Sequence, residues 1–139
     1  KNRDIAFSET YAALQALRFM WRYGDGRIEK ARLRQSMRHF LERPELTDIV
    51  IADLARWKDW GIQDKLMNLY GKDEFDIPGI KRAIVRYMLV CAESESKNGA
   101  DGKPVELPKH VTKARLYLEN LRKRDPKTVA SAERFFLLM

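Results

Sequence analysis

The stretch LARWKDWGIQDKLMNLYG, residues 54–71, decides how the fold is interpreted. It places Trp57 and Trp60 three residues apart, among charged residues and directly before Gly61. Residues at this spacing share one face of a helix, and Leu54 lies on the same apolar face. Aromatic side chains on such a face fill the space between packed helices. The stretch therefore predicts a packed helical corner; the alternative is a ligand platform, for which Trp60 is the candidate.

Apolar residues recur at intervals of three and four along the rest of the chain. This spacing is typical of amphipathic helices, and no alternating segment is long enough to predict a strand. The periodic runs predict helices near residues 8–23, 29–43, 44–59, 62–70, 77–93, 108–124 and 126–138. The expected fold class is all-α, in a single domain over residues 1–139. We expect a mobile loop near 94–107 and interpret it as an insertion rather than a binding loop.

Residues that begin and end helices support these boundaries. Side chains that cap a helix N-terminus stand before three of the runs, at Ser8, Asp76 and Asp125. Proline, whose missing amide hydrogen costs nothing in the first helical turn, opens three runs, at Pro44, Pro108 and Pro126. Glycine follows three runs and suits a left-handed position there, at Gly24, Gly61 and Gly71.

A weak internal repeat relates residues 13–24 to residues 50–61. At an offset of 37 residues Leu17 aligns with Leu54, and each stretch ends in an aromatic residue followed by glycine. A two-helix unit of about this period is typical of helical solenoids. Neighbouring units of a solenoid share one continuous core, because no unit covers its own apolar face.

The segment IKRAIVRYML, residues 80–89, resembles the second helix of a HEAT-type repeat. A basic residue there is followed by small and branched apolar residues, and the resemblance extends best over residues 44–93. It implies an irregular, HEAT-like α-α superhelix of about seven helices, and it implies no activity. An irregular helical bundle is the alternative.

Composition describes a folded chain of 139 residues, with 45% hydrophobic and 34% charged residues. No run reaches the ~20 apolar residues of a membrane span, so we expect no membrane insertion. The single cysteine, Cys91, is interpreted as a small buried hydrophobic residue. The chain begins with Lys1 rather than methionine, so it is compatible with a removed targeting segment and predicts no compartment.

Positive charge is concentrated in two segments. Residues 27–43 hold six basic and two acidic residues, and residues 108–127 hold seven basic and two acidic residues. In the first segment four basic residues fall within roughly 80° of a helix surface, as a phosphate-tracking face requires: Arg27, Lys30, Arg34 and Arg38. In the second, a basic cluster at 122–124 lies near a helix C-terminus, where it also complements the helix dipole.

Candidate catalytic and metal-binding residues are few. His39 and His110 are far apart and stand in no known metal-binding motif, so neither is assigned a metal. Asp53 lies beside the apolar stripe and is expected to pair with Arg56, or with an arginine of a later helix; a catalytic carboxylate is the sharper alternative. We therefore expect no catalytic residue, no metal and no cofactor.

The leading function is a non-enzymatic protein-interaction or scaffold module, and nucleic-acid binding through the two basic segments is the alternative. The expected partner is another protein or the remainder of a longer chain, with a homodimer as a further alternative. The apolar segment AERFFLLM, 132–139, is expected to be covered from two sides or to form a two-fold contact. The candidate binding residues are Arg27, Lys30, Arg34, Arg38, Trp60, Lys113, Arg122, Lys123 and Arg124.

Overall fold

A computed structural model describes residues 2–24, 29–93 and 108–138, with side chains from Ser8 to Arg134. Within these ranges the chain forms helices and no strand, which confirms the all-α prediction. The predicted loop near 94–107 lies outside the described residues. The α-helices are α1 (Asn2–Tyr23), α2 (Lys30–Arg38), α3 (Thr47–Arg56), α4 (Gln63–Leu69), α5 (Pro78–Ala92), α6 (Lys109–Arg124) and α7 (Pro126–Leu138). Two short 3-10 helices are η1 (Trp60–Ile62) and η2 (Asp73–Phe75).

The chain divides into two compact units, residues 1–50 and 51–139, and the division falls within α3. The expectation of a single domain stays a prediction. No helix among the described residues is long and apolar enough to cross a membrane.

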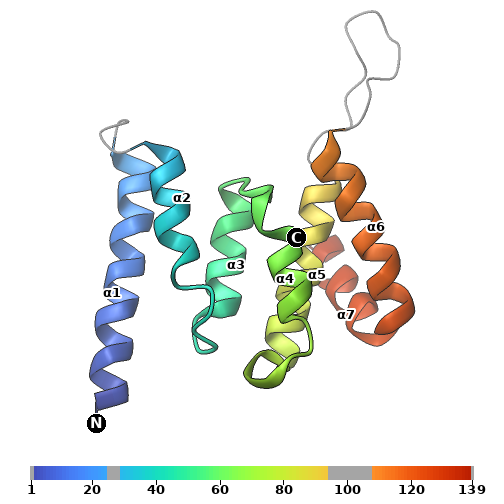
Figure 1. The fold of residues 1–139 in the computed structure, drawn as a ribbon, viewed down its shortest axis with the longest axis horizontal. Coiled ribbons are helices and arrows are strands. Elements are labelled where there is room, and N and C mark those ends of the chain that lie inside the picture. The colour runs from blue at the N-terminus through green and yellow to red at the C-terminus, as the bar shows by residue number, and fades with distance from the viewer. Residues whose placement is uncertain (1, 25–28, 94–107, 139) are drawn as a thin grey trace, which may run out of the picture. The chain divides into compact units, whose positions relative to one another are not determined.

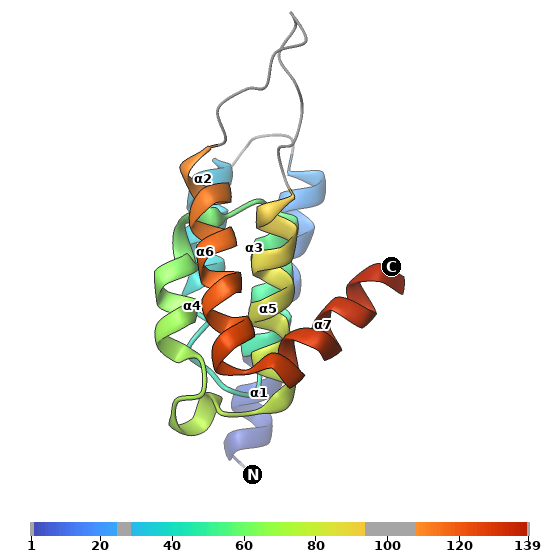
Figure 2. The ribbon, with the colours of Figure 1, turned by 90° about the vertical axis from the view of Figure 1, so that its right-hand side faces the viewer.

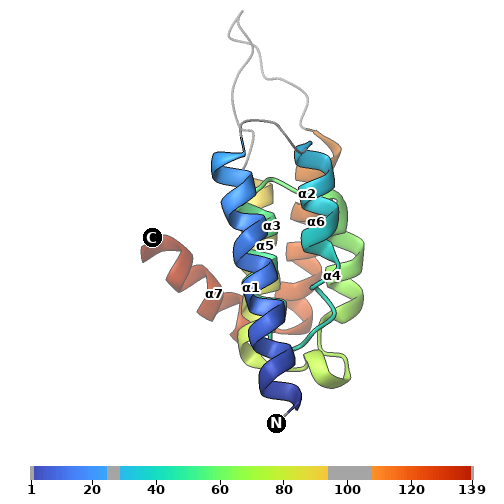
Figure 3. The ribbon, with the colours of Figure 1, turned by 90° about the vertical axis from the view of Figure 1, so that its left-hand side faces the viewer.

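The first unit is built on α1 and α2, which lie antiparallel and side by side (Figures 1 and 3). Leu14 and Leu17 of α1 are buried, as are Leu33 and Met37 of α2. These positions recur at the three- and four-residue spacing of the sequence, so hydrophobic burial explains why the two segments form paired helices.

The boundary between the second and third predicted helices is wrong. Helix α2 ends at Arg38 instead of residue 43, and α3 begins at Thr47 instead of Pro44. The amides of residues 39–41 donate to carbonyls three residues back instead of four, and Pro44 has no amide hydrogen with which to restore the α-helical pattern. The buried Thr47 hydroxyl lies 2.7 Å from the Leu41 carbonyl oxygen and 2.8 Å from that of Arg43, and this contact holds the turn.

The predicted helix 44–59 ends earlier than expected, at Arg56. Lys58 takes a left-handed φ of 57°. The Asp59 amide donates to the Leu54 carbonyl at 2.9 Å, and the Lys58 amide donates to the Ala55 carbonyl at 3.1 Å. This pair of bonds is a Schellman motif, which satisfies the last helical carbonyls. The chain therefore turns between the two tryptophans rather than after both.

The left-handed glycine prediction is confirmed at one position only. Among the described glycines Gly71 alone has a positive φ, of 72°, directly after α4. Gly24 and Gly61 do not, so those two assignments are wrong. At the end of α3 the left-handed position is taken by Lys58 instead, because the Schellman motif falls there.

Of the three N-cap predictions, one is confirmed and two are wrong. The Thr128 amide donates to Asp125 Oδ1 at 3.4 Å, which confirms Asp125 as the cap of α7. Asp76 is not the cap of α5, because Ile77 occupies that position and Asp76 pairs with Lys81 at 3.1 Å. Ser8 does not cap α1, because that helix already begins at Asn2.

The second unit is organised around α5, which packs against α6 and α7 (Figure 2). Nine residues of α5 are buried. The buried stripe of α6 comprises Val111, Ala114, Leu118 and Leu121. Helix α7 contributes the buried Val129 and Ala132. The side chains of Phe135 and Phe136 lie outside the described residues, so the expectation for the terminal segment stays a prediction.

Candidate functional site

The two tryptophans occupy different environments. Trp57, just past the end of α3, is 5% exposed, which confirms its predicted place in the packed corner. Trp60 begins η1 and is half-buried. Its ring lies edge-on to Tyr87 with centroids 5.3 Å apart, and it stacks on His110 with centroids 6.0 Å apart. Packing against these two rings gives Trp60 a structural role at this corner.

A buried polar cluster lies beside this aromatic packing. Gln63 Nε2 donates to the His110 carbonyl at 2.9 Å and lies 3.0 Å from Cys91 Sγ. The Cys91 thiol also donates to the His110 carbonyl, at 3.4 Å. Gln63 Oε1 is buried, and no described group donates a hydrogen bond to it. The cluster joins α4, α5 and α6, and it confirms that Cys91 is buried.

Cys91 is expected to resist thiol reagents in the folded protein. Burial raises the pKa of its thiol to about 11, so at pH 8 only about one thiol in a thousand is ionised. We expect a disulfide reagent to leave Cys91 unmodified in native buffer and to react fully in denaturant. Equal reaction rates in the two buffers would contradict the burial of this thiol.

Asp53 has a structural partner. Its carboxylate is buried and lies 3.7 Å from the Arg56 guanidinium, one turn further along α3, as the sequence predicted. His39 is exposed and follows the last residue of α2. In the described ranges no three histidine, cysteine or acidic side chains gather in a way that suits a metal ion.

The first basic segment packs partly on an aromatic ring that sequence reasoning left out. Lys30 Nζ and Arg34 Cζ lie 5.1 Å and 5.3 Å from the centre of the Trp21 ring. Arg38 is half-buried at the end of α2. Arg27 lies outside the described residues. The interaction joins α1 to α2, and no spacing rule within one helix predicts it.

Two basic residues of the second segment contact α4 and the residue that follows it. Lys113 Nζ lies 2.7 Å from Asp64 Oδ1, and the Tyr117 hydroxyl donates to the same carboxylate. The hydrogen bond from Lys113, with that from Tyr117, lowers the pKa of Asp64. Arg124 instead donates to the Tyr70 carbonyl at 3.0 Å, with its guanidinium over the Tyr70 ring.

Arg122 and Lys123 complete this segment. Both are exposed, and the Arg122 guanidinium lies 3.3 Å from Glu133 of α7. Three of the predicted binding residues of α6 therefore contact neighbouring parts of the unit: Lys113 contacts α4, Arg124 contacts the residue that follows α4, and Arg122 contacts α7. These contacts link α6 to its neighbours in the second unit, and the three side chains are also exposed to solvent.

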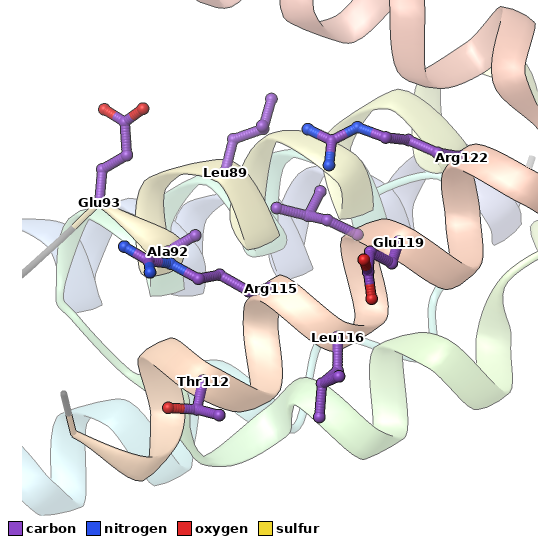
Figure 4. A pocket seen from close by; sticks show the side chains of 9 residues that line it. Leu89, Ala92, Glu93, Thr112, Arg115, Leu116, Glu119 and Arg122 are labelled. Carbon is purple, nitrogen blue, oxygen red and sulfur yellow. The ribbon is translucent and has the colours of Figure 1, made fainter.

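A groove lies between α5 and α6 in the second unit (Figure 4). Its volume is about 540 Å³. Leu89 and Leu118 contribute apolar surface to it, and Leu116 lies at its outer edge with 60% of its surface exposed. Of the predicted binding residues, Arg122 alone lines it.

Charged side chains border the groove. Figure 4 shows Arg115 and Arg122 extending from α6 toward α5, with Glu93 at the far end of α5. Glu119 lies between the two arginines along α6. The groove therefore combines an apolar floor with a border of both charges. Leu116 was a sequence clue to it, because this leucine stands apart from the buried stripe of α6.

The fold and this groove define an all-α protein with an open, solvent-facing surface groove. No protein-family model, curated protein or solved structure matches the chain.

Proposed function

We propose that the chain is a non-enzymatic protein-interaction or scaffold module, built as a HEAT-like stack of helix pairs. Each compact unit contains an antiparallel helix pair, α1 with α2 in the first and α5 with α6 in the second (Figures 1 and 2). A pair of amphipathic helices is the unit from which helical solenoids are assembled.

The groove between α5 and α6 is the observation that carries the proposal. Its apolar floor is bordered by charged groups, which is the composition of a protein-binding surface with an apolar centre and a polar rim. Leu116, at 60% exposure, adds apolar surface that the fold of its own unit does not cover. An amphipathic helix suits such a groove, because its apolar side chains recur every three or four residues.

The border charges define the complementary peptide. Arg115 and Arg122 stand seven residues apart on α6, which is two helical turns or about 10 Å. Carboxylates at matching spacing, on either side of a leucine-like anchor, would meet the two guanidinium groups. Arg122 would bind a peptide carboxylate in place of its present partner, Glu133, or together with it.

Selection from a displayed library of random helical peptides tests this proposal. The full chain is immobilised, and selected peptides are measured against the Arg115→Glu and Leu116→Arg variants. We expect apolar-acidic peptides that lose at least about tenfold in affinity on either variant, because one loses a charge partner and the other loses apolar contact.

The matched control is Asn68→Arg, on the exposed surface of α4 and outside the groove. It adds the same side chain as Leu116→Arg and should leave peptide affinity unchanged. Peptides that bind the wild type and both groove variants equally would contradict the groove as the interaction site.

Nucleic-acid binding through residues 27–43 and 108–127 is the alternative function. One observation favours it in the first segment only, namely the two cations over the Trp21 ring. In the second segment, the ion pairs of Lys113 and Arg122 within the unit favour a structural role.

A further inference from the structure

The α1–α2 hairpin brings aromatic and cationic side chains together on the first unit. Lys30 and Arg34 place their charged groups over the Trp21 ring. The Arg22 guanidinium lies 5.8 Å from the centre of the Tyr23 ring. Cations at such distances are attracted to the electron-rich face of an aromatic ring. From this juxtaposition we infer that the hairpin binds single-stranded nucleic acid, with bases stacked on aromatic rings and phosphates held by the cations.

Phe19 and Tyr23 provide the stacking surface. They are 64% and 58% exposed, and their ring centroids lie 5.0 Å apart. The two residues are one turn apart, so they share a face of α1 and form a continuous exposed aromatic patch. A patch of this kind marks an interaction surface, whereas single exposed apolar residues do not. Every nucleobase has a flat π face, so an aromatic ring binds bases with little sequence preference.

Local charge selects a polyanionic partner for this patch. Residues 18–38 contain seven basic and two acidic residues. Arg22, Lys30 and Arg32 are exposed, so they present positive charge directly to solvent. Neutralising phosphates with such groups releases counterions and supplies most of the sequence-independent affinity for nucleic acids.

The aromatic patch distinguishes a single strand from a duplex. A duplex keeps its bases inside the stack and presents mainly phosphates to a flat surface, so Phe19 and Tyr23 would gain little from it. A single strand presents bases and phosphates together. The aromatic patch of Phe19 and Tyr23 lies in residues 1–50, whereas the groove of the proposed function lies in residues 51–139. The two proposals are therefore tested independently of each other.

Fluorescence anisotropy with a labelled single-stranded oligothymidine tests the inference on the full chain. The Phe19→Ala and Tyr23→Ala substitutions should each weaken binding about fivefold or more, because each removes a stacking partner and no charge. Both side chains are exposed, so folding should be preserved, as circular dichroism will show. The matched control Ile77→Ala removes another exposed apolar side chain, in the second unit, and should leave affinity unchanged.

Salt dependence tests the cations separately. Lys30→Glu should lower affinity and reduce the slope of log K against log salt by about 0.7 for one lost phosphate contact. Lys72→Glu changes the net charge equally at an exposed loop of the second unit and should preserve most of the slope. Three results would overturn the inference: no binding at low salt, equal binding of a duplex of the same length, or no effect of the two aromatic substitutions.

Discussion

Replacing Trp57 by alanine is expected to lower the free energy of unfolding by about 3–5 kcal/mol, the range for large buried aromatic residues. The indole is 5% exposed and lies at the residue that follows the last turn of α3. Its loss removes apolar burial and leaves a cavity at the turn where the chain changes direction.

Urea unfolding followed by circular dichroism measures this loss. Trp60→Ala is the comparison. Trp60 is only half-buried, although its ring packs edge-on to Tyr87 and stacks on His110. We expect a clearly smaller loss at Trp60 than at Trp57. A loss below about 1 kcal/mol at Trp57 would contradict its burial in the corner and would reopen the interpretation of the tryptophans as a ligand platform.

Local sequence rules predicted the helices well because burial follows the helical period. Leu14 and Leu17 in the first helix, and Ile80 and Ile84 in α5, are buried at the predicted spacing. Asp125 was recognised as a cap because its contact with Thr128 spans only three residues. Features that depend on a few neighbouring residues are therefore readable from the sequence alone.

The wrong predictions concern turns in which the backbone conformation is not the one that the residue type favours. Lysine is not a common left-handed residue, so the end of α3 at Lys58 was missed and Gly61 was chosen instead. Likewise, Pro44 is predicted as the first residue of a helix, whereas α3 begins at Thr47, whose hydroxyl reaches back to the Leu41 carbonyl and holds the turn. Each of these turns is held by a contact that the periodic pattern does not encode.

The candidate sites depend on contacts between helices, and these were only partly predictable. The basic stripe was visible in the sequence, but the packing of Lys30 and Arg34 on Trp21 needs two helices in register. The groove joins Leu89 of α5 to Leu116 of α6, which are separated by 27 residues. Charge and exposure identify candidate residues, whereas the surface on which they act is set by tertiary packing.

Tyr87 is expected to be as important for stability as Trp57, and two substitutions separate its contributions. Its side chain is fully buried in α5, its ring meets the edge of Trp60, and its hydroxyl donates to the Asp59 carbonyl at 2.6 Å. Tyr87→Ala should lower the free energy of unfolding by about 3–5 kcal/mol, because it removes a large buried ring and leaves a cavity.

Tyr87→Phe keeps the ring and removes only the hydrogen bond, so the expected loss is about 0.5–1.5 kcal/mol. That bond connects α5 to Asp59, the residue whose amide completes the Schellman motif after α3. It therefore links the turn after α3 to the central helix of the second unit. Urea unfolding of the two variants measures both terms. If phenylalanine cost as much as alanine, the hydroxyl contact would outweigh ring packing at this position, and the description of α5 as an apolar centre would need revision.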